Sequence, residues 1–322
     1  MTNTGTLTVR VARKATIATD ICTLELETTD GSALPAFSAG SHIDVHLPGG
    51  ITRQYSLCND SKETHRYMIG VLRDPASRGG SSTVHDGVSE GQTLQISTPK
   101  NHFPLASDAK HSLLLAGGIG VTPLLCMAER LAIMGADFQM HYCTRSEERT
   151  AFMQRIRQSS FARQVHFHHD DGAAMQKLDL AELLETPQLG MHIYVCGPKG
   201  FMDAALTLAR AAGWPAHQLH YEFFGAEVAK SDTDASFAVK LASSGRIVLV
   251  PHDMTVAQAL AKAGVEVQTS CEQGVCGTCL TRVLEGEPDH KDMYLTPEEQ
   301  AANDQFTPCC SRSKTPVLVL DL

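Results

Sequence analysis

Three cysteines lie within nine residues in the segment CEQGVCGTC, at Cys271, Cys276 and Cys279. Their spacing, four residues and then two, followed by a distant fourth cysteine, is typical of a plant-type [2Fe-2S] site. A zinc ribbon is the competing interpretation, but zinc ribbons usually pair two C-x2-C knuckles and this segment supplies one. The segment therefore predicts an iron–sulfur domain whose fold must bring a fourth cysteine to this loop.

The fourth ligand is expected at Cys309, in the segment TPCCSRS. Its neighbour Cys310 competes for the role, but consecutive side chains in extended backbone point in opposite directions, so only one of the two should reach the cluster. Gly274 and Gly277 are expected to let the loop wrap tightly and aim its amides at the sulfurs, because glycine adopts such backbone angles at little cost.

The residues around the cysteines predict a complete small domain over 235–322. FAVKL and RIVLV alternate in hydrophobicity around the turn ASSG, which indicates a hairpin. TVAQALAKAG then predicts a helix with Thr255 as N-cap and Gly264 at its end, and PVLVLDL predicts a last strand. This pattern resembles the plant-type ferredoxin family and implies an α+β, β-grasp fold, joined through a polar linker at 229–234.

Length and composition limit the other possibilities. A chain of 322 residues is too long for one typical core and favours two or three domains. It has no apolar run near the roughly 18 residues that a membrane span needs and no signal peptide, so we expect a cytoplasmic protein with reduced cysteines and no membrane partner. The net charge of −9 argues against nucleic acid as a partner.

Residues 1–104 predict an antiparallel β-barrel. Short alternating segments such as LTVRVAR, ICTLELET, SHIDVHL and QTLQIST are separated by Gly, Pro and Ser turns. Within TRQYSLCND, Arg53 and Tyr55 fall on one strand face, where the guanidinium could hold a phosphate and the aromatic ring could lie along a flavin. An exposed edge strand with ordinary polar residues is the alternative. The Arg-x-Tyr-Ser pattern resembles the flavin signature of the ferredoxin-reductase superfamily, and that resemblance implies that Ser56 lies near the flavin N5.

A glycine-rich turn completes the expected flavin site. Gly79, Gly80 and Ser81 lead into a short predicted helix, and backbone amides at such a turn can bind an anion. The turn resembles the phosphate-binding turn of the FMN-using branch of the superfamily. The sequence shows no separate feature for a pyrophosphate and adenine, so FMN is expected in preference to FAD.

Residues 105–228 predict an α/β domain with a doubly wound parallel sheet, because strand and helix patterns alternate along them. The strand Leu113–Ala116 runs into the turn GGIGVTP, after which Thr122 is expected as the helix N-cap and Gly135 as its end. A glycine-rich turn alone is weak evidence of nucleotide binding. It resembles the nicotinamide-domain turn of the superfamily, which implies pyrophosphate contacts at four residues: Gly118, Gly120, Val121 and Thr122.

Other residues of this domain are assigned through the same resemblance. Cys196, Gly197 and Pro198 resemble the motif beside the nicotinamide, where Cys196 would shape the hydride-transfer pocket without a covalent step; a buried core cysteine is the alternative. Phe224, or its neighbour Phe223, would stack near the flavin, although core packing is an equal alternative for each.

The choice of nucleotide depends on the residues after the second strand of this domain. Arg145 and Arg149 stand beside Glu147 and Glu148, so no basic cluster is ready for a 2′-phosphate, and NADH is favoured over NADPH. The pair at 170–171, two aspartates, could contact a ribose, although a solvated loop is the stronger interpretation.

The order of flavin barrel, nicotinamide domain and C-terminal ferredoxin, together with these motifs, resembles the phthalate dioxygenase reductase family, which includes vanillate demethylase reductase subunits. The resemblance implies electron flow from NADH through FMN and [2Fe-2S] to a Rieske-type terminal oxygenase, and a monomer suffices for it. A stand-alone flavin or iron reductase and a redox-sensing module are the alternatives. The aromatic substrate is not determined, because it would bind the oxygenase.

Charge suggests how such a partner would dock. Residues 235–322 carry 11 acidic and 7 basic side chains, a net charge of −4. An acidic face is therefore expected to steer a basic patch on the oxygenase, with a plain solvated face as the alternative. Six residues after the cysteine loop would form it: Glu285, Glu287, Asp289, Asp292, Glu298 and Glu299.

Overall fold

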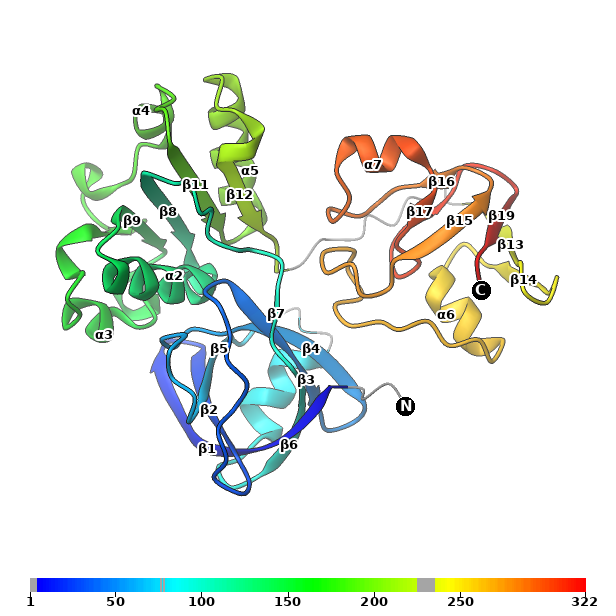
Figure 1. The fold of residues 1–322 in the computed structure, drawn as a ribbon, viewed down its shortest axis with the longest axis horizontal. Coiled ribbons are helices and arrows are strands. Elements are labelled where there is room, and N and C mark those ends of the chain that lie inside the picture. Colours follow the sequence, from blue (N-terminus) through cyan, green and yellow to red (C-terminus); the bar gives the residue numbers. More distant parts are fainter. Residues whose placement is uncertain (1–4, 76, 78, 225–234) are drawn as a thin grey trace. The chain divides into compact units, whose positions relative to one another are not determined.

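The structure is a computed structural model that describes residues 5–75, 77, 79–224 and 235–322. The described residues form two compact units, the first ending at Phe224 and the second lying within 235–322 (Figure 1). The expected linker at 229–234 lies outside the described residues. None of the helices in the described ranges is both long and apolar enough to span a bilayer.

The first unit begins with an antiparallel β-barrel. Its strands are hydrogen-bonded in the order β4-β3-β6-β1-β2-β5, with β7 paired to β3, and a bridge between Leu57 and Ile69 links the end of β4 to β5 and closes the sheet. Alternate residues such as Leu24 and Leu26 fill its interior, as period-two side-chain alternation requires. The strands are β1 (Thr6–Ala18), β2 (Ile21–Thr28), β3 (Ser41–Leu47), β4 (Ile51–Ser56), β5 (Tyr67–Leu72), β6 (Thr93–Ser97) and β7 (Lys100–Asn101). A short helical segment, α1 (Gly80–Ser82) continuing into η1 (Thr83–Gly87), lies between β5 and β6.

The same unit contains a five-stranded, all-parallel sheet in the order β10-β9-β8-β11-β12. Alternation along β8 fixes its two layers: Leu114 and Ala116 join the core that includes α2, whereas Leu113 and Leu115 join the core that includes α5. This confirms the doubly wound sheet. Its strands are β8 (His111–Gly117), β9 (Asp137–Thr144), β10 (Val165–His169), β11 (Met191–Cys196) and β12 (Leu219–Glu222), and its helices are α2 (Val121–Met134), α3 (Met153–Arg157), α4 (Leu180–Leu184) and α5 (Lys199–Ala211).

The ends of α2 show where local sequence signals succeed and fail. Gly135 ends the helix in the left-handed conformation, with φ of 65°, as expected for a glycine terminator. Thr122, however, is not the N-cap. The helix begins at Val121, two residues before the start that a Thr122 N-cap would give, because a 3-10 turn (η2, Gly118–Gly120) winds directly into it. The Thr122 hydroxyl donates to the Ile119 carbonyl 3.1 Å away.

The second unit is an α+β domain with a small mixed sheet in the order β14-β13-β19-β15-β17. The predicted hairpin, helix and last strand are present, and Thr255 forms a capping box with Gln258 at the start of α6. Its elements are β13 (Phe237–Leu241), β14 (Ile247–Val250), α6 (Val256–Lys262), β15 (Thr281–Glu285), β16 (Pro288–Asp289), α7 (Pro297–Ala302), β17 (Gln305–Phe306), β18 (Arg312–Ser313) and β19 (Val317–Leu320). Residues 263–280 join α6 to β15 without helix or strand and carry three of the clustered cysteines.

Candidate functional site

The Arg53 side chain lies against the glycine-rich turn that precedes α1. A Cβ atom added to Gly80 would fall 2.7 Å from the Arg53 Cγ and 2.8 Å from its Nε, so this close approach requires glycine. Gly79 has φ of 90°, a conformation that glycine adopts readily, and Ser81 accepts a 3.1 Å hydrogen bond from the Asp74 amide. The structure thus brings together the guanidinium and the Gly79–Ser81 turn that were assigned to one phosphate.

Tyr55 lies two residues along β4 from Arg53 and therefore on the same side of the strand. It is partly buried and packs against the barrel core. Burial raises the pKa of the Tyr55 phenol, a shift that the nearby Arg53 partly offsets. At neutral pH the ring is therefore neutral, so it could offer an apolar face to an aromatic ligand.

Two glycine turns meet at the carboxyl ends of β8 and β11. A Cβ on Gly120 would fall 2.4 Å from the carbonyl carbon of Cys196, and one on Gly197 would fall 2.8 Å from the Gly117 Cα. Strand order reverses between β8 and β11, since β9 and β10 follow on one side and β12 on the other. Such a switch point is where doubly wound sheets bind dinucleotides. The turn containing Gly118, with φ of 52°, is thus suitably placed for one.

Four polar or thiol side chains, two from each sheet of the first unit, meet beside this switch point. His42 and Ser56 are register partners on β3 and β4, and Cys196 and Glu222 are register partners at the ends of β11 and β12. The Ser56 hydroxyl donates a 3.1 Å hydrogen bond to Glu222 Oε2, and His42 Nδ1 lies 4.0 Å from Glu222 Oε1. The Glu222 carboxylate therefore links the flavin-signature serine to the edge of the parallel sheet.

Burial sets the protonation of this group. It raises the pKa of Glu222 to about 7, although the hydrogen bond from Ser56 acts in the opposite direction. Burial, reinforced by the negative charge of Glu222, raises the pKa of Cys196 well above its ordinary value. Cys196 is thus a neutral thiol at physiological pH. A thiol rather than a thiolate suits a pocket-shaping residue and not a nucleophile.

Glu222 and His42 were missed by the sequence analysis. The available signal for Glu222 was an acidic residue at the carboxyl end of the strand HYE, at the same sheet edge as the CGP motif. His42 offered no local signal. Its proximity to Glu222 depends on contacts between chain segments 180 residues apart.

The aromatic and charged residues expected around the nucleotide fall in different environments. Phe223 packs partly buried against the core around α5, whereas Phe224 is 41% exposed. Phe224 is therefore the aromatic side chain that is free to contact a ligand. Arg149 forms a 2.9 Å ion pair with Asp20 of the barrel, so its charge is already matched.

In the second unit, the clustered thiols lie together and are buried. The thiol of Cys309 lies close to those of Cys271, Cys279 and Cys310, and that of Cys271 lies close to Cys276. All ten cysteines of the chain are free of disulfides. Within the described residues, no three His, Cys, Asp or Glu side chains surround a position for one metal ion. A [2Fe-2S] cluster divides four thiolates between two irons, and these clustered thiols supply such a donor set.

The argument that favoured Cys309 over Cys310 was based on the wrong backbone conformation. Residues 308–310 form a turn and not extended chain: the amides of Cys310 and Ser311 both donate to the Thr307 carbonyl. The two adjacent thiols differ in their other neighbours. Cys310 Sγ lies 3.1 Å from the Thr307 hydroxyl, whereas Cys309 contacts Cys271 and Cys279.

The two glycines of the cysteine loop have the conformations expected of them, with φ of 71° at Gly274 and 68° at Gly277. A Cβ on Gly274 would overlap the Cys310 sulfur, and one on Gly277 would overlap the ring of Tyr294. Neither position could accept a larger residue. The loop is therefore tightly wrapped, and its donor set of thiols fits a [2Fe-2S] cluster.

The acidic face is smaller than expected. The Asp292 side chain is fully buried, so it does not belong to a surface. Glu287 pairs with Lys314 at 2.8 Å and Asp289 lies 3.8 Å from Lys291, which reduces their effect on a partner. Glu285, Glu298 and Glu299 remain exposed.

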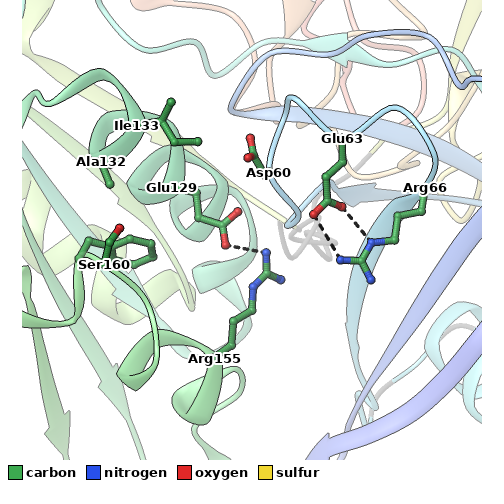
Figure 2. Close-up of a pocket in the computed structure, with 9 residues that line it drawn as sticks. Asp60, Glu63, Arg66, Glu129, Ala132, Ile133, Arg155 and Ser160 are labelled. Atoms are coloured by element: carbon green, nitrogen blue, oxygen red, sulfur yellow. Dashed lines mark hydrogen bonds and ion pairs between the residues drawn. The ribbon is translucent and has the colours of Figure 1, made fainter.

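A pocket of about 300 Å³ lies elsewhere in the first unit, between the barrel loop at 60–66 and helices α2 and α3 (Figure 2). Four of its five charged groups pair with one another. Arg155 bonds Glu129 at 2.6 Å and Arg66 bonds Glu63 at 2.9 Å. None of the predicted site residues lines this pocket, so it is separate from the site described above.

Comparison with known proteins places these features in a wider context. Residues 239–314 match the family model for a 2Fe-2S iron-sulfur cluster binding domain, and residues 97–219 match the N-terminal domain of dimethylamine monooxygenase subunit DmmA-like proteins. The chain is 56% identical to a vanillate O-demethylase oxidoreductase from Pseudomonas putida, over 95% of this chain and 96% of that protein. It is 40% identical to phthalate dioxygenase reductase from Burkholderia cepacia, over 99% and 98% of the two chains.

The fold is similar over the same length. A solved structure of phthalate dioxygenase reductase, described as a modular structure for electron transfer from pyridine nucleotides to [2Fe-2S], matches with a TM-score of 0.79 at 40% identity. It covers 99% of this chain and 98% of that one. The predicted three-part fold of antiparallel barrel, parallel α/β sheet and ferredoxin-like domain is confirmed.

Proposed function

The chain belongs to the phthalate dioxygenase reductase family, and from this premise we propose that it is the NADH-dependent reductase component of an aromatic oxygenase. One observation carries the proposal. The dinucleotide switch point and the flavin-signature Ser56 meet in one site through Glu222, on a chain that also carries a [2Fe-2S] domain. Vanillate and phthalate are named for relatives at 56% and 40% identity, so an aryl acid or aryl ether is the substrate class we infer for the oxygenase.

Arg53 and the amides of the Gly79–Ser81 turn would hold the phosphate of FMN. Because Gly80 has no Cβ, the Arg53 side chain can pack directly against that turn. Tyr55 would offer its neutral ring to the isoalloxazine, and Phe224 would cover the flavin from the end of the parallel sheet. When bound, FMN accepts a hydride and releases electrons singly, which couples a two-electron donor to a one-electron cluster.

Gly118, Gly120, Val121 and Thr122 would hold the pyrophosphate of NADH at the switch point. Cys196, Gly197 and Pro198 would shape the nicotinamide pocket from the neighbouring strand end. The neutral Cys196 thiol would exclude water there and take no covalent step. NADH is favoured over NADPH because Arg149 is already paired with Asp20.

Ser56 is proposed to contact the reacting face of the flavin, and Glu222 is proposed to position it. The 3.1 Å hydrogen bond orients the Ser56 O–H toward Glu222 Oε2, so the lone pairs of Ser56 Oγ point elsewhere. Since Glu222 sits beside Cys196 in register, one carboxylate would align the flavin-side and nicotinamide-side residues.

Cys271, Cys276, Cys279 and Cys309 are proposed as the cluster ligands. Cys310 would remain a neighbour of the cluster, held by the Thr307 hydroxyl. The recipient of the electrons is proposed to be a Rieske-type oxygenase, approached by a monomeric, cytoplasmic reductase. Ten free cysteines suit such a reducing compartment.

An anaerobic titration of the purified protein with NADH, followed by absorbance, tests this proposal. We expect one FMN and two irons per chain, with flavin and cluster bands bleaching together. Bleaching of the flavin with a persistently oxidised cluster would contradict coupled transfer. Zinc in place of iron would refute the cluster assignment.

A further inference from the structure

The fully buried Asp292 has no role in the scheme above, although it touches both segments that carry the cluster cysteines. Its side chain has 0% of its surface exposed. A charged side chain is rarely buried completely unless it is hydrogen-bonded or paired. The question is therefore what this carboxylate does next to the cysteine loop.

Asp292 packs directly on the loop at Gly274, between Cys271 and Cys276. A Cβ on Gly274 would lie 3.0 Å from both the Cα and the Cβ of Asp292. The next residue, Met293, donates its amide to the Gly274 carbonyl at 3.0 Å. The aspartate backbone and the loop are thus held in contact.

The carboxylate also reaches the turn that carries Cys309. The Ser311 hydroxyl donates to Asp292 Oδ1 at 3.2 Å, and Ser311 Oγ lies 3.0 Å from the Thr307 hydroxyl, which contacts the Cys310 sulfur at 3.1 Å. The Leu295 amide donates to Asp292 Oδ2 at 2.9 Å. Hydrogen-bond donors of the protein therefore reach both oxygens of the buried carboxylate.

His290 lies beside this carboxylate: its Nδ1 is 3.4 Å from Asp292 Oδ1, and its side chain is 7% exposed. Buried charges interact strongly over short distances because water does not screen them. A buried negative charge disfavours addition of an electron to a neighbouring group that is already negative.

We propose that Asp292 tunes the reduction potential of the [2Fe-2S] site, as a buried negative charge that ties the 271–279 loop to the 307–311 turn. This inference rests on the proposed cluster ligands and adds a residue that acts on the cluster without binding it. Asp292 is a positioning residue and not a ligand. Its charge makes the cluster a stronger reductant toward the partner oxygenase.

The test is a redox titration of the full-length protein, followed by the electron paramagnetic resonance signal of the reduced cluster. Asp292→Asn removes the charge and keeps an acceptor for Ser311 or Leu295. We expect its potential to rise by an amount equivalent to about tenfold in the one-electron equilibrium, which corresponds to 59 mV. Ser311→Ala keeps the charge and removes one hydrogen bond, so we expect a shift of less than about threefold.

Asp289→Asn is the matched control. It removes the same charge three residues away, from a side chain that is 38% exposed, and should leave the potential unchanged because solvent screens it. Asp292→Ser is a second neutral variant that can still cap the 292–295 turn, in case Asp292→Asn does not assemble.

An unchanged potential in the neutral Asp292 variants overturns the inference. So does a shift in Ser311→Ala as large as that in Asp292→Asn, because geometry and not charge would then be responsible. If both neutral variants lack the cluster signal, the carboxylate is required for assembly and the tuning role is refuted. Failure of the wild-type protein to show any cluster signal would instead refute the proposed function.

Discussion

The Ser56 hydroxyl donates a 3.1 Å hydrogen bond to Glu222, a residue 166 positions later that ends the last strand of the parallel sheet. Ser56 ends β4 of the barrel, so this bond joins the two sheets of the first unit. Cys196 is the register partner of Glu222 on the neighbouring strand. The reactive faces expected for flavin and nicotinamide are therefore coupled through one partly buried carboxylate.

If Glu222 acts by holding Ser56, removing either residue should cause the same loss. We expect Ser56→Ala and Glu222→Ala each to slow flavin reduction by NADH by about tenfold, since a hydrogen bond to a charged group contributes roughly 1.5–3 kcal/mol. The double variant should be no slower than either single variant. Anaerobic stopped-flow absorbance of the flavin measures these rates.

Strictly additive losses in that cycle would show that the two residues act independently. Reduction of the cluster by dithionite, which bypasses the nucleotide, serves as the control. It should be unchanged in all three variants.

The raised pKa of Glu222 makes a prediction for stability. Its pKa is about 7 in the folded protein against 4.5 for an unperturbed glutamate, because burial disfavours the charged form. Between these values the folded protein retains a proton that the unfolded chain has released, so the free energy of unfolding falls as pH rises through this window. The difference of about 2.5 between the two pKa values corresponds to at most roughly 3.4 kcal/mol of unfolding free energy.

Glu222→Gln cannot ionise and should lack this component. Urea unfolding at pH 5 and pH 8 should therefore show the wild-type protein losing more stability than Glu222→Gln as pH rises. Parallel losses in the two proteins would contradict the raised pKa.

Much of the fold could be predicted from local sequence patterns. The segments ICTLELET and SHIDVHL form strands with the predicted bounds, and Thr255 and Gly135 cap their helices as expected. These features depend on side-chain alternation and backbone preferences within a few residues. The same holds for the cysteine spacing, which indicates its chemistry without knowledge of the fold.

The relationships that complete the site depend on contacts distant in sequence. The sequence near Asp292 does not distinguish this buried residue from the exposed acids around it. The sequence near Glu222 does not predict its contact with Ser56. The turn at 308–310 was missed because its hydrogen bonds to the Thr307 carbonyl replace the extended conformation that the neighbouring strands suggested. The roles of these residues depend on their burial and on their contact partners in the fold, which residue type alone does not reveal.

Gly120 should be intolerant of any side chain. A Cβ there would fall within 3.0 Å of the Cys196 and Gly197 backbones, which cannot retreat as a flexible side chain could. Gly120→Ala should separate the two turns and reduce NADH-driven flavin reduction at least tenfold. Gly87→Ala is a matched control, because its nearest neighbour would be the Thr83 Cγ2 at an ordinary 3.5 Å. Equal rates in the two variants would argue against a nucleotide site at this turn.

Arg53 should determine flavin affinity. Arg53→Gln removes the positive charge beside Gly80, and we expect the Kd for FMN to rise by roughly tenfold to a hundredfold, with Arg53→Lys in between because lysine keeps the charge but not the bidentate geometry. Fluorescence titration of flavin-free protein with FMN measures this. Arg13→Gln, an exposed arginine 3.7 Å from Glu25, should bind FMN normally. A normal Kd in Arg53→Gln would remove Arg53 from the phosphate site.

The remaining exposed acids of the second unit should steer the oxygenase. Glu285 and Glu298 are exposed, and neither forms an ion pair within the described residues. Their charges can therefore act on an approaching partner. We expect turnover with the oxygenase to fall as salt rises, because attraction between exposed charges is screened beyond about 10 Å at 0.1 M ionic strength. Glu285→Gln/Glu298→Gln should lower kcat/KM at low salt by several-fold and flatten the salt dependence. Glu182→Gln/Glu185→Gln changes net charge equally on the first unit and should behave as wild type. Turnover that does not change with salt would show that charge does not govern docking. Equal effects of the two double variants would show that net charge, and not these two acids, governs it.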